Sequence, residues 1–439
     1  MKKVVFILVF TLSASISYAQ VSDGGNARSG SIYSFFGAGT PVDIGSIEEE
    51  SAGVFGISLK GFSSTGFANP AFFGQSLFTA TTIGLSVSRF DARDVNGRST
   101  NALVNPTSFL LSFPLYTGKL GVGVGLYQVT NSRFRVFQNG TVSKGDDANI
   151  GFSVNDRGSG GINKLEFGVG FKLTPSISLG YAPSYVFLSS SIESVLETDD
   201  PAVGDQVSFF NTDGQGFGNR FGLVYNKRDL LWANDALTFG ATLTLPTKIS
   251  SERVNQFDKF LGIDNEGFSI IETITIDEGE GLGRGDIELP LEYGAGFTYR
   301  PSPYTNFSVE GQVQKWSDTS FDFSPEQETF LKDRFRVGVG TQFHPYRKRS
   351  NRFLSKFKYG VGVNYDTGHL QINGQNIETL VFSTGLGILG RGRSGSALDL
   401  SFQYGIRGTR KNNLVKEDIW SFKLSLNLSE LMFIRRRLQ

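Results

Sequence analysis

The sequence predicts an all-β protein, a transmembrane antiparallel β-barrel of about fourteen strands with an N-terminal plug inside its lumen. Three observations support this fold class. Apolar and polar residues alternate in many segments, tight and long connections alternate along the chain, and the N-terminus has the pattern of a secretion signal. No later apolar run is long enough for a transmembrane helix. A membrane chain without such helices must close into a barrel, because open strand edges cannot face hydrocarbon.

The N-terminus predicts export. Lys2 and Lys3 precede an apolar stretch at 4–12, and Ser17-Tyr18-Ala19 has the small-x-small pattern of a cleavage site. We therefore expect a signal peptide at 1–19 and a mature chain that begins at Gln20. The expected domains are this signal peptide, a hatch or plug at 20–76, and a transmembrane barrel at 77–439.

The composition narrows the classes of function. The 439 residues include 42 basic and 42 acidic side chains, so charge gives no reason to expect a nucleic-acid partner. Cysteine is absent, which excludes disulfides, thiolate metal sites and thiol nucleophiles. The 54 glycines and 40 phenylalanines suit an all-β chain.

The predicted strands are short segments with period-two alternation, bounded by turn residues. In the last of them, Trp420, Phe422 and Leu424 alternate with Ser421, Lys423 and Ser425. Charged and glycine-rich faces of this kind would be costly in a dry core and are tolerated in a wet lumen. The expected strands are 81–91, 106–115, 119–134, 162–174, 176–192, 216–227, 236–250, 287–300, 304–316, 333–344, 353–367, 377–390, 396–408 and 416–430.

The connections between these strands supply a second signal. Tight turns are expected at 117–118, 174–176 and 301–303, and they alternate with longer links, of which 251–286 is the longest. Outer-membrane barrels place tight turns on the periplasmic side and long loops outside the cell. The longer links are therefore expected to face the outside.

The segment before the first strand is too apolar and too rich in small residues for a free tail. It contains the stretch 31–39, SIYSFFGAG, the acidic run Glu48-Glu49-Glu50, and Asn69-Pro70-Ala71. We expect it to fold inside the barrel. Pro70 removes a backbone donor and restricts Asn69, so this motif can fix a bend, although Asn69 can also be a simple turn residue before a strand.

These features resemble the FadL-type outer membrane transporters of hydrophobic compounds. In that family a hatch carrying Asn-Pro-Ala precedes a fourteen-stranded barrel, and Asn69-Pro70-Ala71 stands at the matching place. The segments 289–301 with Trp316, 334–345 and 420–428 are also similar to its later strands. The 31–39 stretch and the end at Arg435-Arg436-Arg437-Leu438-Gln439 depart from the pattern, which points to an uncharacterised branch.

The resemblance implies an integral protein of the Gram-negative outer membrane that takes up small hydrophobic molecules, fatty-acid-like or aromatic, by a passive hatch-gated route. Its expected partners are this hydrophobic molecule, outer-membrane lipids and lipopolysaccharide. Apolar residues of the longest link are candidates for substrate capture, unless they pack on one another: Phe257, Phe260, Leu261, Phe268, Ile270 and Ile271. The alternative hypothesis is a barrel of this type that docks a protein partner in a secretion or surface-assembly machine.

Other chemistry finds little support in the sequence. Gly385, Gly387 and Gly390 fit GxGxxG, but they lie in an alternating strand and not in a strand-turn-helix unit. His344 and His369 fall at a strand end and in a turn, where structural roles are expected. The acidic residues Asp277, Glu278, Glu280 and Asp286 could bridge to lipopolysaccharide through cations or could simply be solvated. We expect no catalytic residues, no metal, no cofactor and no enzymatic activity.

Overall fold

The fold is that of a computed structural model. It describes residues 29–61, 63–95, 97–143, 149–200, 204–264, 267–276, 283–323, 328–345, 353–390 and 395–430. The predicted signal peptide at 1–19 lies outside these residues. In the described part of the chain, no helix has the length and apolar character needed to cross a membrane.

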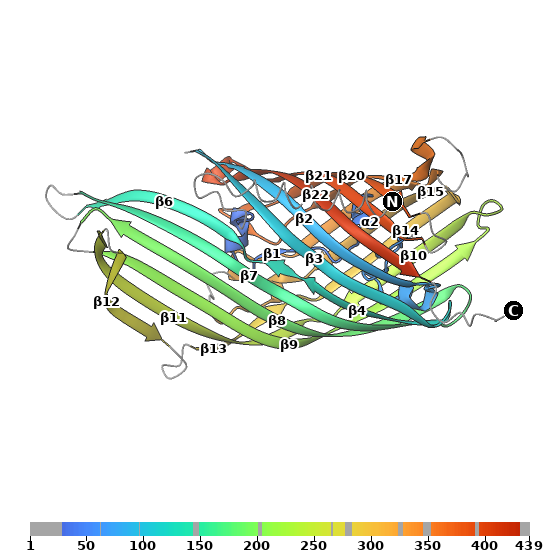
Figure 1. The fold of residues 1–439 in the computed structure, drawn as a ribbon, viewed down its shortest axis with the longest axis horizontal. Coiled ribbons are helices and arrows are strands. Elements are labelled where there is room, and N and C mark those ends of the chain that lie inside the picture. Colours follow the sequence, from blue (N-terminus) through green and yellow to red (C-terminus); the bar gives the residue numbers. More distant parts are fainter. Residues whose placement is uncertain are drawn as a thin grey trace, which may run out of the picture.

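The wall is a closed antiparallel β-barrel of 14 strands, which confirms the predicted fold class (Figure 1). Several wall strands are interrupted, so β4 and β6, β10 and β11, and β13 and β14 continue one another. The first and last strands, β2 and β22, pair to close the ring. The wall elements are β2 (Thr79–Arg93), β3 (Arg98–Tyr116), β4 (Leu120–Gln128), β6 (Phe134–Ser143), β7 (Asn149–Lys172), β8 (Ile177–Thr198), β9 (Asp205–Arg228), β10 (Ala236–Thr244), β11 (Thr247–Asp264), β12 (Gly267–Ile276), β13 (Arg284–Leu289), β14 (Glu292–Ser302), β15 (Thr305–Gln314), β16 (Arg334–Phe343), β17 (Phe357–Asp366), β20 (Thr379–Leu389), β21 (Ala397–Gly408) and β22 (Lys416–Glu430).

The two faces of the wall follow the predicted alternation. Phe402 and Phe422, which pair across β21 and β22, are both exposed on the outside. Asp399 and Lys358 are only 3 % exposed and face the filled interior. Because apolar side chains stand outward and ionic ones inward, the wall has the arrangement of a barrel in lipid and not that of a sandwich. The protein is therefore integral to the outer membrane.

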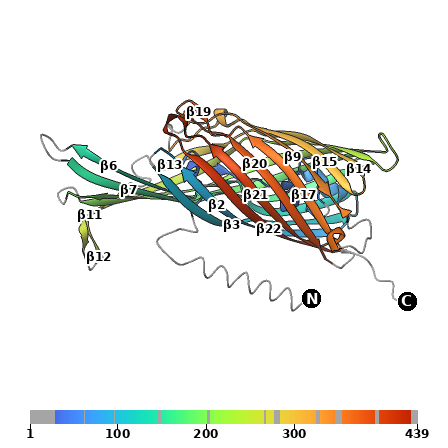
Figure 2. The same ribbon diagram turned by 90° about the horizontal axis from the view of Figure 1, so that it is seen from above.

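The strands extend much further on one side of the barrel than the sequence predicts. β7 and β9 each contain 24 residues and β8 contains 22, while the predicted strands 162–174, 216–227 and 176–192 contain 13, 12 and 17 residues. The predicted link at 251–286 is not an irregular loop, because it contains most of β11, all of β12 and the start of β13. Together β6, β12 and the outer parts of β7, β8, β9 and β11 form an outer sheet beyond the barrel rim (left in Figure 1; Figure 2).

The N-terminal segment, residues 29–78, lies inside the wall. It contains short elements only: η1 (Ile32–Phe35), β1 (Thr40–Pro41), α2 (Ile47–Glu50) and η2 (Pro70–Gln75). β1 pairs with β5 (Thr130–Asn131), the short piece of chain between β4 and β6. Most of its side chains are buried against the lumen face of the barrel. The exact domain division at 20–76 and 77–439 stays a prediction.

The outer end of the lumen is covered by apolar side chains from the connections. Trp316 in η4 (Trp316–Asp318), Leu370 beside the β18–β19 hairpin (Gln371–Ile372 and Gln375–Asn376), and Leu414 after η7 (Lys411–Asn413) are buried in one cluster. Tyr33 of η1 belongs to the same cluster and donates a hydrogen bond to the Val415 carbonyl. η6 (Phe353–Lys356) lies at the opposite end, directly before β17.

Candidate functional site

The predicted motif Asn69-Pro70-Ala71 lies at the contact between the N-terminal segment and the wall. Asn69 is fully buried and caps η2, because its side-chain oxygen accepts the Ala71 N–H at 3.1 Å. Its amide nitrogen donates to the carbonyls of Ile57 at 2.8 Å and Leu223 at 3.1 Å. The motif therefore fixes a turn and attaches that turn to β9.

Glycines on the lumen face allow this close approach. A Cβ at Gly180 would lie 2.2 Å from the Ala71 nitrogen, and one at Gly222 would lie 2.2 Å from the Asn69 oxygen. Farther around the wall, Gly340 faces the Ala52 carbonyl in the same way, at 1.9 Å. The inward glycines thus let the backbone of the N-terminal segment pack directly on the strands.

A single wall carboxylate, Glu310 of β15, holds the turn at 55–59. Its oxygens accept the backbone N–H groups of Phe55, Ile57, Ser58 and Leu59 at 2.7, 3.1, 2.7 and 3.0 Å, and the Ser58 hydroxyl at 2.9 Å. Glu310 is 1 % exposed. Converging N–H groups of this kind form an anion-binding nest, and here the anion belongs to the barrel itself.

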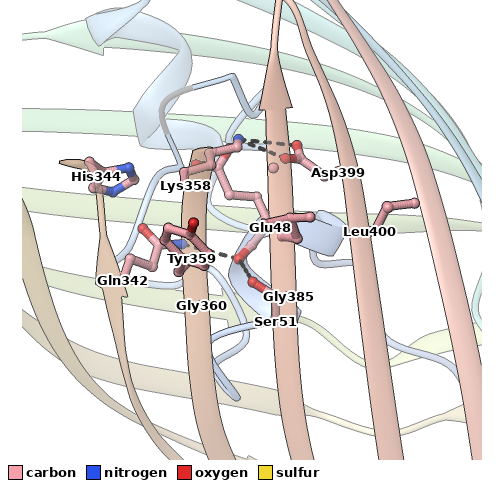
Figure 3. Close-up of a pocket in the computed structure, with 12 residues that line it drawn as sticks. Glu48, Ser51, Gln342, His344, Lys358, Tyr359, Gly360, Gly385, Asp399 and Leu400 are labelled. Carbon is pink, nitrogen blue, oxygen red and sulfur yellow. Dashed lines mark hydrogen bonds and ion pairs between the residues drawn. The ribbon is translucent and has the colours of Figure 1, made fainter. Parts of the chain in front are cut away.

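A second charged contact joins α2 to β17 and β21. The Lys358 ammonium lies 2.7 Å from Glu48 and 2.9 Å from Asp399, and Figure 3 shows the Lys358 side chain directed toward Asp399. Asn427 donates a further hydrogen bond to Asp399 at 2.6 Å. Because all three charged groups are buried and mutually paired, removal of one partner would leave an uncompensated charge.

Glu50 of the acidic run and the nearby Asp43 are also anchored. Glu50 pairs with Lys423 of β22 at 2.5 Å, and Asp43 pairs with Arg336 of β16 at 2.5 Å. The Arg336 guanidinium also lies 4.1 Å from the ring centre of Phe55. No local sequence pattern indicates these partners, because charged residues recur on the lumen faces of many strands and only the fold selects which of them meet the N-terminal segment.

Glu49 differs from its neighbours, because it forms no salt bridge among the described residues. It accepts hydrogen bonds from the Gly61 N–H at 2.7 Å and from the Ser46 hydroxyl. Burial, together with the adjacent charge of Glu48, raises the pKa of Glu49 to about 7. Burial lowers the pKa of Lys60, on the same segment, to about 8, against the attraction of the Glu49 charge. Both groups therefore have pKa values near neutral pH.

The wall has a seam between β3 and β6. The pairing of β3 with β4 ends at Ser108 and Tyr127, and β6 pairs with β7. No described residue pairs across the gap between 98–107 of β3 and β6. At the foot of the seam Gly30 bridges the two sides, because its N–H donates to the Arg133 carbonyl at 3.0 Å and its carbonyl accepts the Asn101 amide at 3.2 Å. The N-terminal segment therefore closes the base of this opening.

A cavity of about 200 Å³ lies beside the seam, between the N-terminal segment and the wall. Its lining is mixed, with Phe90 and Leu103 next to Asn105, Gln403 and other polar residues. The space around Lys358, in contrast, is only about 10 Å³. The lumen is thus filled over much of its section, and the free volume adjoins the interrupted strand.

The predicted capture residues do not come together in an irregular loop. Phe257, Phe260 and Leu261 lie on β11, and Phe268, Ile270 and Ile271 lie on β12. The Phe257 ring meets Phe210 of β9 edge-on, with ring centres 5.7 Å apart. The side chains of the other five lie outside the described residues, so their capture role stays a prediction.

The remaining sequence candidates have structural surroundings. Gly385 and Gly387 lie within β20, and Gly390 directly follows it, which agrees with the rejection of a dinucleotide site. The buried His369 ring packs on Trp316, with centres 5.1 Å apart, and burial lowers its pKa to about 3. His344 is buried at the end of β16, and its N–H donates to the Tyr304 carbonyl. Asp286 pairs with Lys248 at 2.6 Å, while 277–280 lie outside the described residues.

Comparisons with known proteins agree with this architecture. The family model described as BamG matches residues 1–439. No curated protein matches the chain. Among solved structures, the CymD monoaromatic hydrocarbon channel has a TM-score of 0.54 at 15 % identity and covers 88 % of this chain and 98 % of its own. A Pseudomonas aeruginosa FadL homologue has a TM-score of 0.54 at 10 % identity, covering 89 % and 97 %. The Pseudomonas putida toluene transporter TodX has a TM-score of 0.53 at 13 % identity, covering 90 % and 99 %. At these identities the likeness concerns the fold.

Proposed function

This chain belongs to the BamG family and has the FadL-type fold, and we propose that it is an outer-membrane channel for small hydrophobic molecules. In this proposal the N-terminal segment is a hatch that gates a passive route. The observation that carries the proposal is the seam between β3 and β6, whose two sides are bridged by the hatch residue Gly30. Two side-chain hydrogen bonds of Asn105, with Gln128 at 2.7 Å and with Arg133 at 3.4 Å, also cross the base of the seam.

The proposed route begins outside and leaves sideways. A hydrophobic molecule gains roughly 25 cal/mol for each Å² of apolar surface that leaves water, so entry needs no energy source. The cavity beside the seam gives it a temporary position between hatch and wall. Displacement of residues 30–41 would break the Gly30 bridge and the β1–β5 pairing, which opens the seam toward lipid. Solved structures of a monoaromatic hydrocarbon channel and of a toluene transporter have the same fold, which supports a route for hydrophobic molecules.

A reversible lock tests the route. Thr40 and Asn131 face each other across the β1–β5 pair, and the chain has no native cysteine. The double variant Thr40→Cys/Asn131→Cys should form a disulfide that holds the hatch against the interrupted strand. Uptake of radiolabelled toluene and laurate by cells that produce this variant should fall about tenfold when it is oxidised and recover on reduction, a change equivalent to about 1.4 kcal/mol.

The matched control locks wall to wall. Thr238 and Asn226 face each other across β10 and β9, with their side-chain oxygens 2.8 Å apart, and neither lines the cavity beside the seam. The Thr238→Cys/Asn226→Cys variant should leave uptake unchanged in both redox states, because it joins two strands that do not separate. If uptake stays the same when the Thr40–Asn131 disulfide forms, the gated route is contradicted.

A second candidate function is a docking subunit of a secretion or surface-assembly machine. The outer sheet favours it, because strands that extend beyond the membrane serve no spanning purpose and offer a surface to another protein. The mixed polar lining of the cavity beside the seam favours it too. Gentle detergent extraction separates the two proposals: a stoichiometric protein partner supports docking, and a monomeric barrel carrying lipid-like molecules supports uptake.

A further inference from the structure

The outer sheet has two chemically different faces. Leu188 is buried in the interior apolar cluster, and Ile192 and Leu196 lie on the same face of β8, with Ser190 and Ser194 between them. Val154 of β7 pairs with Leu196, and Phe210 of β9 pairs with Ile192, so apolar residues recur on this face in all three strands. Ile192, Leu196, Val154 and Phe210 are half-buried. The inner face of the outer sheet is thus the more apolar of the two and is only partly covered.

The opposite face is more polar. Arg135, Arg157 and Glu193 form one row across β6, β7 and β8, although Phe137 shares this face. On the inner face of β6, Val136 and Val142 flank Gln138 and Gly140. A strand added beside β6 would therefore meet the two valines with one set of alternate side chains and mostly polar neighbours with the other set.

The β6 strand forms a free edge of this sheet. Ser132 donates its N–H to the Gly160 carbonyl toward β7, while the Arg133 carbonyl points away and accepts the Gly30 N–H. Continuing this alternation, the backbone groups of Phe137, Asn139 and Thr141 point away from β7. The described residues include no strand that pairs with these groups.

The edge lacks the usual protection against strand pairing. β6 contains neither proline nor lysine, and two of its apolar side chains, Phe137 at 63 % and Val142 at 57 %, are well exposed. The facing part of β3, in contrast, carries Pro106, which has no N–H to offer. Natural proteins normally block long free edges, so an unblocked one is a template for a further strand.

From this combination we propose that the β6 edge binds an extended strand of a partner protein whose alternate residues are apolar. The backbone of the partner would pair with residues 137–141, and its apolar residues would lie beside Val136 and Val142 of β6, near Phe152 and Val154 of β7. This proposal rests on the docking role above and names the surface and the chemistry of the partner. The chain's own residues 20–28, QVSDGGNAR, fit poorly, because Val21 and Ala27 are their only apolar side chains apart from glycine.

Cysteine scanning tests the pairing, since the chain has no native cysteine. The probe is a synthetic peptide of alternating valine and threonine with lysine at both ends, prepared as a series with one cysteine at each position. We expect Asn139→Cys to form disulfides with every second peptide position. Its cross-strand neighbour Ser153, on β7, is flanked by strands on both sides, so Ser153→Cys should react about tenfold less. A peptide of the same composition with its valines grouped should not react selectively.

Proline substitution gives an independent measurement. The Thr141 N–H points away from β7, so Thr141→Pro removes a partner-facing donor without breaking the β6–β7 pairing. Thr141→Pro should abolish the change in fluorescence anisotropy of the labelled peptide, while Thr141→Ala should preserve it. Equal reaction at Asn139→Cys and Ser153→Cys, or no alternation along the peptide, would overturn the proposal.

Three further outcomes separate the edge proposal from the docking role. If the peptide binds only after residues 20–28 are deleted, the chain's own segment covers the edge and the partner strand is overturned. If a protein partner co-purifies with the full chain but the edge does not react with the peptide, the edge is wrong and the docking role stands. If the edge pairs in alternating register while no partner co-purifies, the edge proposal stands and the docking role fails.

Discussion

At the residue scale, the interior is organised by single ionic groups that each hold several partners. Glu310 binds a whole turn of the N-terminal segment, and Lys358 joins Glu48 to Asp399. Such groups are costly to bury, and their cost is offset only when every lone pair and proton finds a partner. Individual substitutions should therefore have large and local effects on the position of the hatch.

The first prediction concerns Glu310→Gln. The amide keeps the shape of the carboxylate but loses its charge and directs an NH₂ group at backbone donors, so docking of residues 55–59 should weaken by about 2 kcal/mol. Hydrogen exchange followed by mass spectrometry should show faster exchange of the 55–59 amides. Glu430→Gln, at the exposed end of β22, is the control and should exchange like the parent protein.

The second prediction concerns pH. Burial and Glu48 raise the pKa of Glu49 to about 7 in the folded protein, above its ordinary value of 4.5. A raised carboxyl pKa means that the folded state binds the proton more tightly, so its stabilising contribution is complete below about pH 4.5 and is lost as pH rises through 7. Amides at 47–61 should exchange faster at pH 8 than at pH 6, after correction for intrinsic rates.

Glu49→Gln provides the control for this titration. The amide cannot ionise, so the difference between pH 6 and pH 8 should fall to the part that the titration of Lys60 contributes, while the Lys358–Glu48 pair stays in place. A pH dependence of the same size in the variant would assign the effect to another group.

At the scale of elements, the strands position the hatch because inward-facing glycines leave room for its backbone. Gly180 of β8 and Gly222 of β9 leave the space into which η2 and its cap fit. The spanning parts of these strands could be predicted from the sequence, because lipid on one side and polar contents on the other enforce strict alternation. Asn69 could also be identified, since its motif is local and precedes the first strand.

Other elements could not be predicted from local pattern. The segment 149–161, NIGFSVNDRGSGG, is rich in Asn, Gly and Asp, which favours a loop, yet it forms the outer part of β7. Its pairing with β6 and β8 supplies the order that its residues do not encode locally. Likewise, the role of Glu310 depends on a turn more than two hundred residues away in sequence, so no window of the chain contains it.

The third prediction uses the glycines. Gly222→Ala would place a Cβ 2.2 Å from the Asn69 oxygen, so η2 must shift and its docking should weaken by about 1–3 kcal/mol. Urea-dependent protease cleavage within 60–78 should begin at lower urea. Gly311→Ala is a matched control, because its Cβ would meet nothing closer than the Arg336 carbonyl at 3.6 Å. If both variants are cleaved at the same urea concentration, close packing at Gly222 does not hold η2 in place.

At the scale of the whole molecule, the N-terminal segment depends on the barrel for its position. A barrel of this strand number is wide enough for an aqueous channel unless something fills it. The segment fills the lumen and is held there by charged contacts with Arg336 of β16, Lys358 of β17 and Lys423 of β22. The barrel should remain folded without the segment, because its strand pairing is independent of it.

The fourth prediction follows. Deletion of residues 20–76 from the mature protein should produce a steady ionic conductance in planar bilayers, where the full chain is nearly silent. The freed lumen charges then face water, so their desolvation cost disappears and the ring stays closed. Conductance that is unchanged by the deletion, in a variant whose strand content by circular dichroism is intact, would contradict a hatch that blocks the pore.

The pairing of β2 with β22 also sets an order of events during biogenesis. The barrel closes by pairing of its first and last strands, so a chain without β22 cannot close it. The residues that precede β2 must already lie inside the partly closed sheet when β2 and β22 pair, because a closed barrel has no comparable opening for a folded segment. Assembly therefore ends when β2 pairs with β22 around the N-terminal segment of the same chain.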